Sequence, residues 1–239
     1  MKKIIILIYF SIAVSQTSGL LNSEGLTVGG SFSKIYTVDS DNDKLEIDIK
    51  QIGASYLFPE GNLELAGGYS FSESIYNNPI YSTFNFWEKS YQFGGTYYMR
   101  SYPLKLPINF MFTGSYTNSF AGGNVLSLLR SIYGSSYHLS ANTISLSGGF
   151  FTNVFSAKDL NVIVYGDISS ISYELTEEID YVAYKETNDY MLHSFGFGLK
   201  YMNLILVPGV IKNWESGEIY YIINFGINIS KLIPKTTKL

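Results

Sequence analysis

Apolar and polar residues alternate along most of this chain, and the clearest example lies near its end. From Ile219 to Ile229 the sequence reads IYYIINFGINI, with a large apolar side chain at every odd position and Asn224, Gly226 and Asn228 among the residues between them. Successive side chains of a β-strand point to opposite faces, so this period of two predicts a strand with one apolar face. A soluble sandwich and a membrane barrel both alternate, but the barrel turns its apolar face to lipid.

Ten segments with this alternation can be laid out. They predict an all-β fold, a single antiparallel up-and-down transmembrane β-barrel of ten strands, with eight strands as the main alternative. An even number of strands leaves both ends of the chain in the periplasm, and closure pairs every backbone amide, as hydrocarbon requires. The expected strands cover residues 26–38, 44–58, 63–76, 85–100, a fifth segment around 108–116, 137–155, 161–175, 190–202, 204–212 and 218–232.

Three of these strands have a less regular pattern. In the second, the apolar residues change parity near Gln51 and Ile52. This change requires either a β-bulge or an upper half that stands clear of the bilayer. In the seventh, apolar residues occur on both parities. The ninth contains Pro208, which cannot donate to a strand ladder, so this strand is expected to be short or bulged.

The connections between the strands alternate in length. Outer-membrane barrels place short turns in the periplasm and longer loops outside the cell. Residues 121–136 contain apolar side chains at helical spacing, which predicts an amphipathic helix. Residues 176–189 are acidic with interleaved tyrosines and are expected to form a surface recognition loop. The connections after odd strands are 39–43, 77–84, 121–136, 176–189 and 213–217; those after even strands are 59–62, 101–106, 156–160 and a turn near Asn203.

The first fifteen residues have the features of a secretory signal. Lys2 and Lys3 precede an apolar run of about eleven residues, which is too short to cross ~30 Å of hydrocarbon as a helix. Small residues favour cleavage before Gln16. The expected location is the outer membrane of a Gram-negative bacterium. The predicted division is a signal peptide at 1–15, an N-terminal periplasmic lead-in at 16–25, the barrel at 26–232 and a C-terminal tail at 233–239.

Composition narrows the possible functions. The chain contains no cysteine, which excludes disulfides and thiolate metal sites. Removal of Lys2 and Lys3 with the signal changes the formal charge from −4 to −6, and a mildly acidic exported chain argues against nucleic acid as a partner. The 21 tyrosines, 16 phenylalanines and 2 tryptophans suit the aromatic girdles of a membrane barrel.

Over residues 26–232 the pattern resembles the small outer-membrane β-barrel families of Gram-negative bacteria, the OmpA-barrel and OmpW-like proteins. The segment from Asn224 to Ile229 looks like part of their terminal assembly signal. The resemblance implies partners: outer-membrane lipid, lipopolysaccharide and the barrel assembly machinery, with the extracellular partner unknown. Many such proteins end on an aromatic residue, whereas this chain continues to Leu239 and carries Lys231 where an apolar residue is expected.

Two histidines are candidates for catalysis. His138 and Ser140 lie two residues apart, on one strand face, and look faintly like the His-x-Ser of lipid A deacylases, which need a downstream acid; the residue twelve beyond Ser140 is Thr152. His193 lies close to Asp189. Omptin proteases have an Asp-x-His pair, but position 191 here is Met. Both histidines are therefore expected to be non-catalytic.

No cofactor or metal site is assigned. Asp39, Asp41 and Asp43 space their oxygens like the start of a calcium loop, but Lys44 and Lys50 replace the glycine and glutamate that an EF-hand requires. An EF-hand is therefore excluded, and a loose divalent site remains an alternative.

Five charged residues have the parity of the barrel interior. A barrel of eight to ten strands is largely filled by its own side chains, so we expect ion pairs and ordered water to plug the lumen. An apolar conduit would need apolar interior residues on several strands, and only the ninth strand shows them. The five residues are Glu64, Glu88, Arg100, Asp167 and Lys200.

Three functional hypotheses follow. The leading one is a non-enzymatic outer-membrane barrel with a structural or surface-interaction role, or a porin-like, narrow passive conduit. The second is a barrel enzyme that acts on lipid or peptide. The third is a secreted soluble β-sandwich or lipocalin-like binder, which would bury its apolar faces and show no outward aromatic belts.

Overall fold

The computed structural model describes residues 20–21, 23–38, 44–78, 82–100, 108–123, 138–179, 182–215, 217 and 219–230. The predicted signal peptide, the tail at 233–239, the acidic stretch at 39–43 and the predicted helix from residue 124 onward lie outside these ranges. Within them, no helix has the length and hydropathy needed to cross a membrane.

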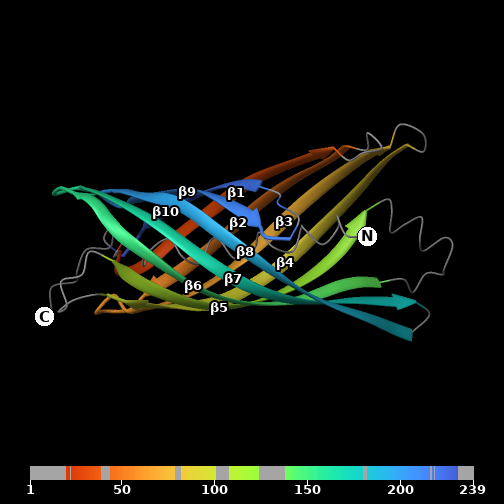
Figure 1. Cartoon of the computed structure of the whole chain (residues 1–239), viewed down its shortest axis with the longest axis horizontal. Helices are drawn as coiled ribbons and strands as arrows, with labels where there is room; N and C mark the ends of the chain where they lie inside the picture. The colour runs from red at the N-terminus through yellow and green to blue at the C-terminus, as the bar shows by residue number, and fades with distance from the viewer. Residues whose placement is uncertain are drawn as a thin grey trace, which may run out of the picture.

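Ten antiparallel strands close into one barrel (Figure 1). Each strand pairs with its neighbours in sequence, and β1 pairs with β10 to complete the circle. The prediction of ten strands is confirmed, and the eight-strand alternative is wrong. The strands are β1 (Gly25–Val38), β2 (Lys44–Leu57), β3 (Leu63–Asn78), β4 (Ser82–Met99), β5 (Asn109–Gly123), β6 (His138–Ser156), β7 (Leu160–Ile179), β8 (Val182–Tyr201), β9 (Leu204–Asn213) and β10 (Ile219–Asn228).

Side chains alternate between the outside and the inside of this wall. In β10, exposed and buried residues follow one another without a break, as the sequence predicts. The exposed residues are the apolar ones: Phe225 and Ile223 face outward, while Asn224 is buried. A soluble sandwich or lipocalin would bury its apolar faces, so the third hypothesis is wrong.

The outward residues form an apolar belt around the barrel. In β4 the belt extends from Tyr91 to Met99, which spans roughly 20 Å along the barrel axis at ~3.3 Å per residue and a tilt near 40°. We call the end of the barrel opposite the short turns the loop end. At the edge of the belt nearest this end, three lysines point outward: Lys50 on β2, Lys89 on β4 and Lys212 on β9. The belt is close to the height that the hydrocarbon of an outer membrane requires.

An ion pair lies on the outer surface above this belt. Lys34 on β1 pairs with Glu46 on β2, and its Nζ lies 3.8 Å from Asp48. The hydrogen bond to Glu46 raises the pKa of Lys34 above its ordinary value. Three outward charges at this level indicate that the upper ends of β1 and β2 face water rather than lipid.

The irregular pattern of β2 reflects this upper half. Its register with β1 and with β3 is continuous, so the alternative with a bulge near Gln51 is wrong. In the lower half of β2, Ile52 faces lipid. In the upper half, the outward positions carry charged residues, and the positions between them, Ile47 and Ile49, face the lumen. The other alternative, an upper half that stands clear of the bilayer, agrees with the structure.

The ninth strand is short and has no bulge. β9 contains 10 residues, and its register with β8 is the same on both sides of Pro208. The strand is apolar on both faces because Leu204 and Leu206 face lipid while Ile205 and Val207 face the lumen.

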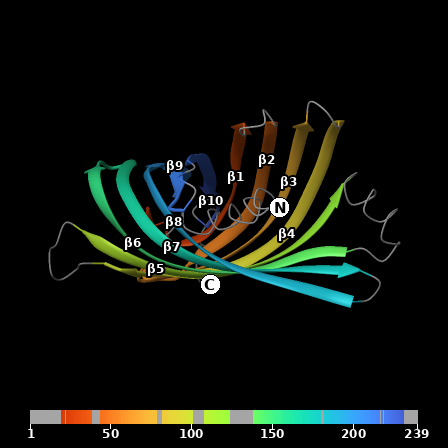
Figure 2. The same ribbon diagram turned by 45° about the vertical axis from the view of Figure 1, so that its right-hand side comes forward.

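The strands differ greatly in length. β7 and β8 have 20 residues each, twice the length of β9 and β10. Figure 2 shows the paired ends of β7 and β8 at the lower right, far from β9 and β10. The prediction of a loop at residues 176–189 is wrong: β7 continues to Ile179, and β8 begins at Val182. We name these outer halves of β7 and β8 the projecting hairpin. In the same way, β3 and β4 extend into the connection predicted at 77–84.

Candidate functional site

Side chains from several strands pack across the lumen at two levels. Near the turn end, aromatic and aliphatic residues from several strands pack across the barrel, and Tyr98 and Phe151 meet edge to face at 5.8 Å. We call this group the lower cluster. Its members are Leu20, Leu21, Leu57, Tyr98, Met111, Phe151, Ile163, Tyr165, Ile205 and Val207.

A second apolar group lies toward the loop end of the lumen. It joins β2 to strands on the opposite wall, and Tyr173 stacks on Tyr190 at 5.8 Å. We call this group the upper cluster. Its buried members are Ile47, Ile49, Ala141, Ile171, Tyr173, Leu192, Tyr220 and Ile222.

These clusters correct the prediction that only the ninth strand lines the lumen with apolar residues. Six strands supply the lower cluster, and β2, β6, β7, β8 and β10 supply the upper one. Two features of the sequence indicate this apolar packing: the inward isoleucines of β2, and the apolar residues on both faces of β7. Both supply side chains to the clusters. Ile163 and Ile171 of β7 face inward, while Ile168 faces lipid.

Part of the expected periplasmic lead-in lies inside the barrel. Leu20 and Leu21 are almost fully buried in the lower cluster. Lys200 Nζ donates to the carbonyl oxygen of Leu21 at 3.4 Å, and Ser23 is hydrogen-bonded to Asn228 of β10. The segment before β1 therefore helps to fill the turn end of the lumen.

Between the two clusters the lumen is polar. Ser31 donates to Gln51 at 2.6 Å, and Thr96 and Thr113 share a hydrogen bond of 2.9 Å across β4 and β5. Asp167 accepts hydrogen bonds from Ser194 at 2.7 Å and Ser169 at 3.3 Å. Hydrogen bonds between neighbouring strands therefore pair some of the buried oxygen atoms in this polar band, while others, such as Ser115 Oγ and Thr143 Oγ1, have no partner among the described residues.

The five predicted interior charges face inward, as expected. Glu64 is fully buried and accepts a hydrogen bond from the hydroxyl of Tyr98 at 2.7 Å. Arg100 donates from Nε to the carbonyl oxygen of Gly61 at 3.0 Å, and its guanidinium lies 5.6 Å from the rings of Tyr98 and Phe151. The sequence predicts ion pairs and ordered water around these charges. In the structure, a tyrosine hydroxyl, a backbone carbonyl and two aromatic rings also contact them.

Glu88 lies higher, near the loop end. Its side chain is buried next to Ser119, Ala141 and Leu175, which line a cavity of about 20 Å³ with it. The cavity has room for about one water molecule.

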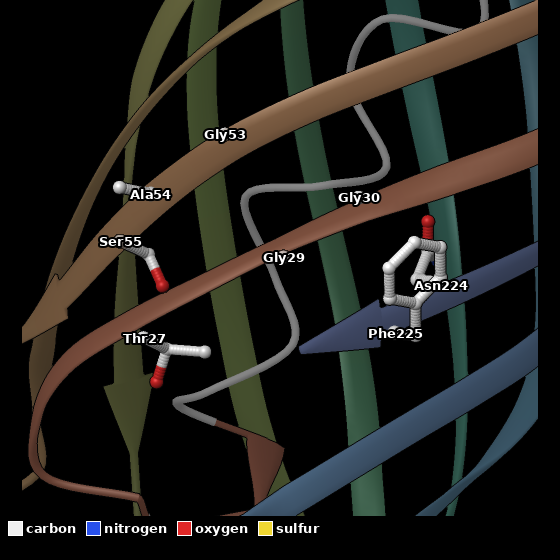
Figure 3. Close-up of a pocket in the computed structure, with 8 residues that line it drawn as sticks. All are labelled: Thr27, Gly29, Gly30, Gly53, Ala54, Ser55, Asn224 and Phe225. Carbon is white, nitrogen blue, oxygen red and sulfur yellow. The ribbon is translucent and has the colours of Figure 1, made fainter. Parts of the chain in front are cut away.

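A cavity of about 10 Å³ lies where β10, β1 and β2 meet (Figure 3). Gly29, Gly53, Thr27 and Asn224 line it, and Thr27 Oγ1 and Asn224 Oδ1 are buried without a hydrogen-bond partner among the described residues. Such a polar space suits a single water. A Cβ on Gly29 would overlap the carbonyl oxygen of Phe225, so glycine is required for this close approach of the strands.

The structure places His138 and Ser140 on the outer face of β6, with the parity of the lipid-facing Ile144. No described residue hydrogen-bonds to either side chain. Asn142, next on the same face, accepts bonds from Tyr116 and Asn118 of β5. These contacts include no acid that could orient His138 as a general base.

The second histidine is also separated from its candidate partner. His193 and Asp189 lie four residues apart along β8, a separation of about 13 Å in an extended strand. The ring of His193 packs against Trp214, with ring centroids 4.7 Å apart. Among the described residues, no group of three or more metal-binding side chains is present.

A closed, even-stranded antiparallel barrel with an apolar outer belt has the architecture of an outer-membrane β-barrel, and this chain has that fold. No family model matches the sequence, and no curated protein does. Among solved structures, it is similar to the translocator domain of the autotransporter NalP from Neisseria meningitidis, at 10% identity and a TM-score of 0.46, covering 95% of this chain and 94% of that chain.

Two further solved barrels are similar in fold. The β domain of the Bordetella autotransporter BrkA is 7% identical, with a TM-score of 0.47, and the match covers 85% of this chain and 99% of that chain. The N-terminal β-barrel domain of OprF from Pseudomonas aeruginosa is 12% identical, with a TM-score of 0.33, covering 85% and 97%. The narrower resemblance to OmpA-barrel and OmpW-like families stays a prediction.

Proposed function

We propose that this protein is a non-enzymatic barrel of the Gram-negative outer membrane. In this role the barrel does not conduct and holds the projecting hairpin at the cell surface. The observation that supports this function most directly is the pair of apolar clusters, one at each end of the lumen. A polar solute that enters the lumen from either end would have to pass both apolar clusters, which gives it no continuous polar path through the barrel.

The belt and its edge support the proposed location. Apolar residues on every strand fit the hydrocarbon, and Lys50, Lys89 and Lys212 at its upper edge suit the phosphate groups of lipopolysaccharide. Export by the signal at 1–15 and insertion by the barrel assembly machinery belong to the same proposal.

The absence of enzymatic activity is also part of the proposal. His138 faces outward without an orienting acid among its described contacts, and His193 packs on Trp214. Incubation of the folded protein with lipopolysaccharide or with model peptides should give no hydrolysis. Turnover that is lost in His138→Ala or His193→Ala would support the enzyme hypothesis instead.

Planar-bilayer recording tests the closed lumen. The reconstituted chain should show no stable conductance of porin size. Leu20→Ser with Leu21→Ser loosens only the lower cluster, and Ile47→Ser with Ile171→Ser loosens only the upper one, so each double variant should also stay closed. A large, reproducible open state in the unmodified protein would contradict the proposal and favour the passive conduit.

A further inference from the structure

The outer half of β8 has a strand edge that no described strand covers. β9 ends at Asn213, opposite Leu192, and the last backbone contact on this side is Trp214 N donating to Met191 O at 3.0 Å. From Val182 to Tyr190, β8 pairs with β7 alone among the described strands. No described strand therefore continues the wall above β9 and β10 beside this part of β8 (Figures 1 and 2).

No described residue pairs with the backbone of this edge. In an antiparallel strand, the amide and carbonyl of alternate residues point to the same side. Because the carbonyl of Met191 points toward β9, the amides and carbonyls of residues 183, 185, 187 and 189 point toward the open side. A row of unpaired donors and acceptors is a template for an added strand.

We infer that this edge binds an extended, basic segment of a partner protein, which pairs with Val182–Tyr190 as an additional strand of the sheet. The inference rests on the proposed role of the projecting hairpin in surface interaction. β-Strand addition of this kind takes its affinity from main-chain hydrogen bonds and its specificity from alternate side chains.

The charge of the hairpin identifies the partner as basic. Residues 174–189 contain six acidic residues and one lysine. That lysine, Lys185, is already bonded to Glu174 at 2.7 Å. Asp189 lies on the outward face of the open edge and makes no ion pair with a described residue, so a lysine or arginine in the added strand would meet a free carboxylate there.

Apolar surface beside the edge favours a partner strand in which basic and apolar residues alternate. Tyr184, on the opposite face from Asp189, is 57% exposed. At the base of the opening, Trp214 is 67% exposed and Met191 43%. Exposed aromatic side chains of this kind are common anchors in interfaces. A strand with basic residues on one face and apolar residues on the other fits this chemistry.

A labelled peptide of alternating Lys and Val, about ten residues long to match the edge, is the probe. Binding to the full-length folded protein is followed by fluorescence anisotropy, and by tryptophan emission in a Trp87→Phe variant, which leaves Trp214 as the single tryptophan. We expect saturable binding that weakens with added salt. A Glu-Val peptide should bind about tenfold more weakly or worse, because it meets an acidic surface.

Thr187→Pro gives the sharpest variant. The amide of Thr187 points to the open side, so proline removes a donor to the added strand without removing one from the β7–β8 ladder. Binding should fall about tenfold or more, whereas the matched variant Thr187→Ala should bind normally. If Thr187→Pro fails to fold, N-methylation of alternate peptide amides on the side that meets β8 gives the same test on the unmodified protein.

Each result has a definite meaning. Equal binding of the N-methylated and unmodified peptides, or no binding at all, would overturn the strand-addition proposal. Dimerisation that Thr187→Pro abolishes would assign the edge to a second copy of this chain and would also overturn it. These outcomes leave the closed, membrane-embedded barrel untouched, because its own test is the absence of conductance.

Discussion

Asn228, in the last strand, donates from Nδ2 to the carbonyl oxygen of Ser23 at 3.0 Å and to its hydroxyl at 2.8 Å. Ser23 precedes the first strand, so this side chain joins the two ends of the barrel chain. Both residues are fully buried, and the same amide also donates to the carbonyl oxygen of Glu24 at 2.9 Å. The contact fixes the segment that carries Leu20 and Leu21 into the lower cluster.

Replacement of Asn228 should therefore release this segment. Asn228→Leu leaves the Ser23 carbonyl and hydroxyl buried without these donors, which should lower the free energy of unfolding by about 1–3 kcal/mol. The chain has no cysteine, so a single Leu21→Cys can be labelled cleanly. Maleimide should react slowly with Leu21→Cys alone and much faster when Asn228→Leu is added. Equal labelling rates would show that Asn228 does not hold the segment.

Two isoleucines on the outer face of β10 test the membrane belt. Ile223 lies near the middle of the belt, while Ile219 lies at its loop end, opposite Lys212. Ile223→Arg should lower the stability in a bilayer by about 2–4 kcal/mol, and Ile219→Arg by only about 0–1 kcal/mol. Reversible folding into lipid vesicles measures both. Equal losses at the two positions would be inconsistent with a belt of this depth.

Two isoleucines of β7 test the packed lumen. Ile171 is fully buried in the upper cluster, whereas Ile168 is 53% exposed on the outer face. Ile171→Ala should destabilise the barrel by about 2–5 kcal/mol because it leaves a cavity, and Ile168→Ala should have a much smaller effect because lipid fills the space. Urea unfolding in the same lipid compares them directly. A water-filled lumen would instead make Ile171→Ala nearly neutral.

Shortening the projecting hairpin should leave the barrel intact. Thr176 and Lys185 face each other above the belt, and deletion of the residues between them, closed by a two-residue turn, removes no member of either cluster. The shortened protein should still migrate faster before boiling than after it on a detergent gel. A variant that no longer folds would show that the hairpin stabilises the barrel rather than projecting from it.

The regular strands could be predicted because their environment is simple. Where lipid lies on one side and small polar residues on the other, as in β10, alternation reports both the strand and its outward face. The prediction is less secure where this contrast disappears. Ile47 and Ile49 are apolar because they fill the upper cluster, and their parity suggested a bulge that the structure does not contain.

The projecting hairpin was missed for the opposite reason. Beyond the belt, the outward side of β7 carries Glu174, Thr176 and Glu178, since it meets water instead of lipid. Apolar and polar residues then no longer alternate, so the sequence pattern of this acidic stretch does not distinguish a strand from a loop. The position of Leu20 and Leu21 could not be predicted from local pattern at all, because it depends on a lumen assembled by strands far away in sequence.

The unequal strand lengths also bear on how the barrel assembles. β7 and β8 meet through a local hairpin and pair along all 20 residues, so they can form early with little loss of chain entropy. β1 and β10 pair only from Thr27 to Lys34, and they join opposite ends of the chain. This short seam is expected to close last. Gly29 and Gly226 face each other there, so the final pairing step brings two bare backbones together without having to rearrange side chains between them.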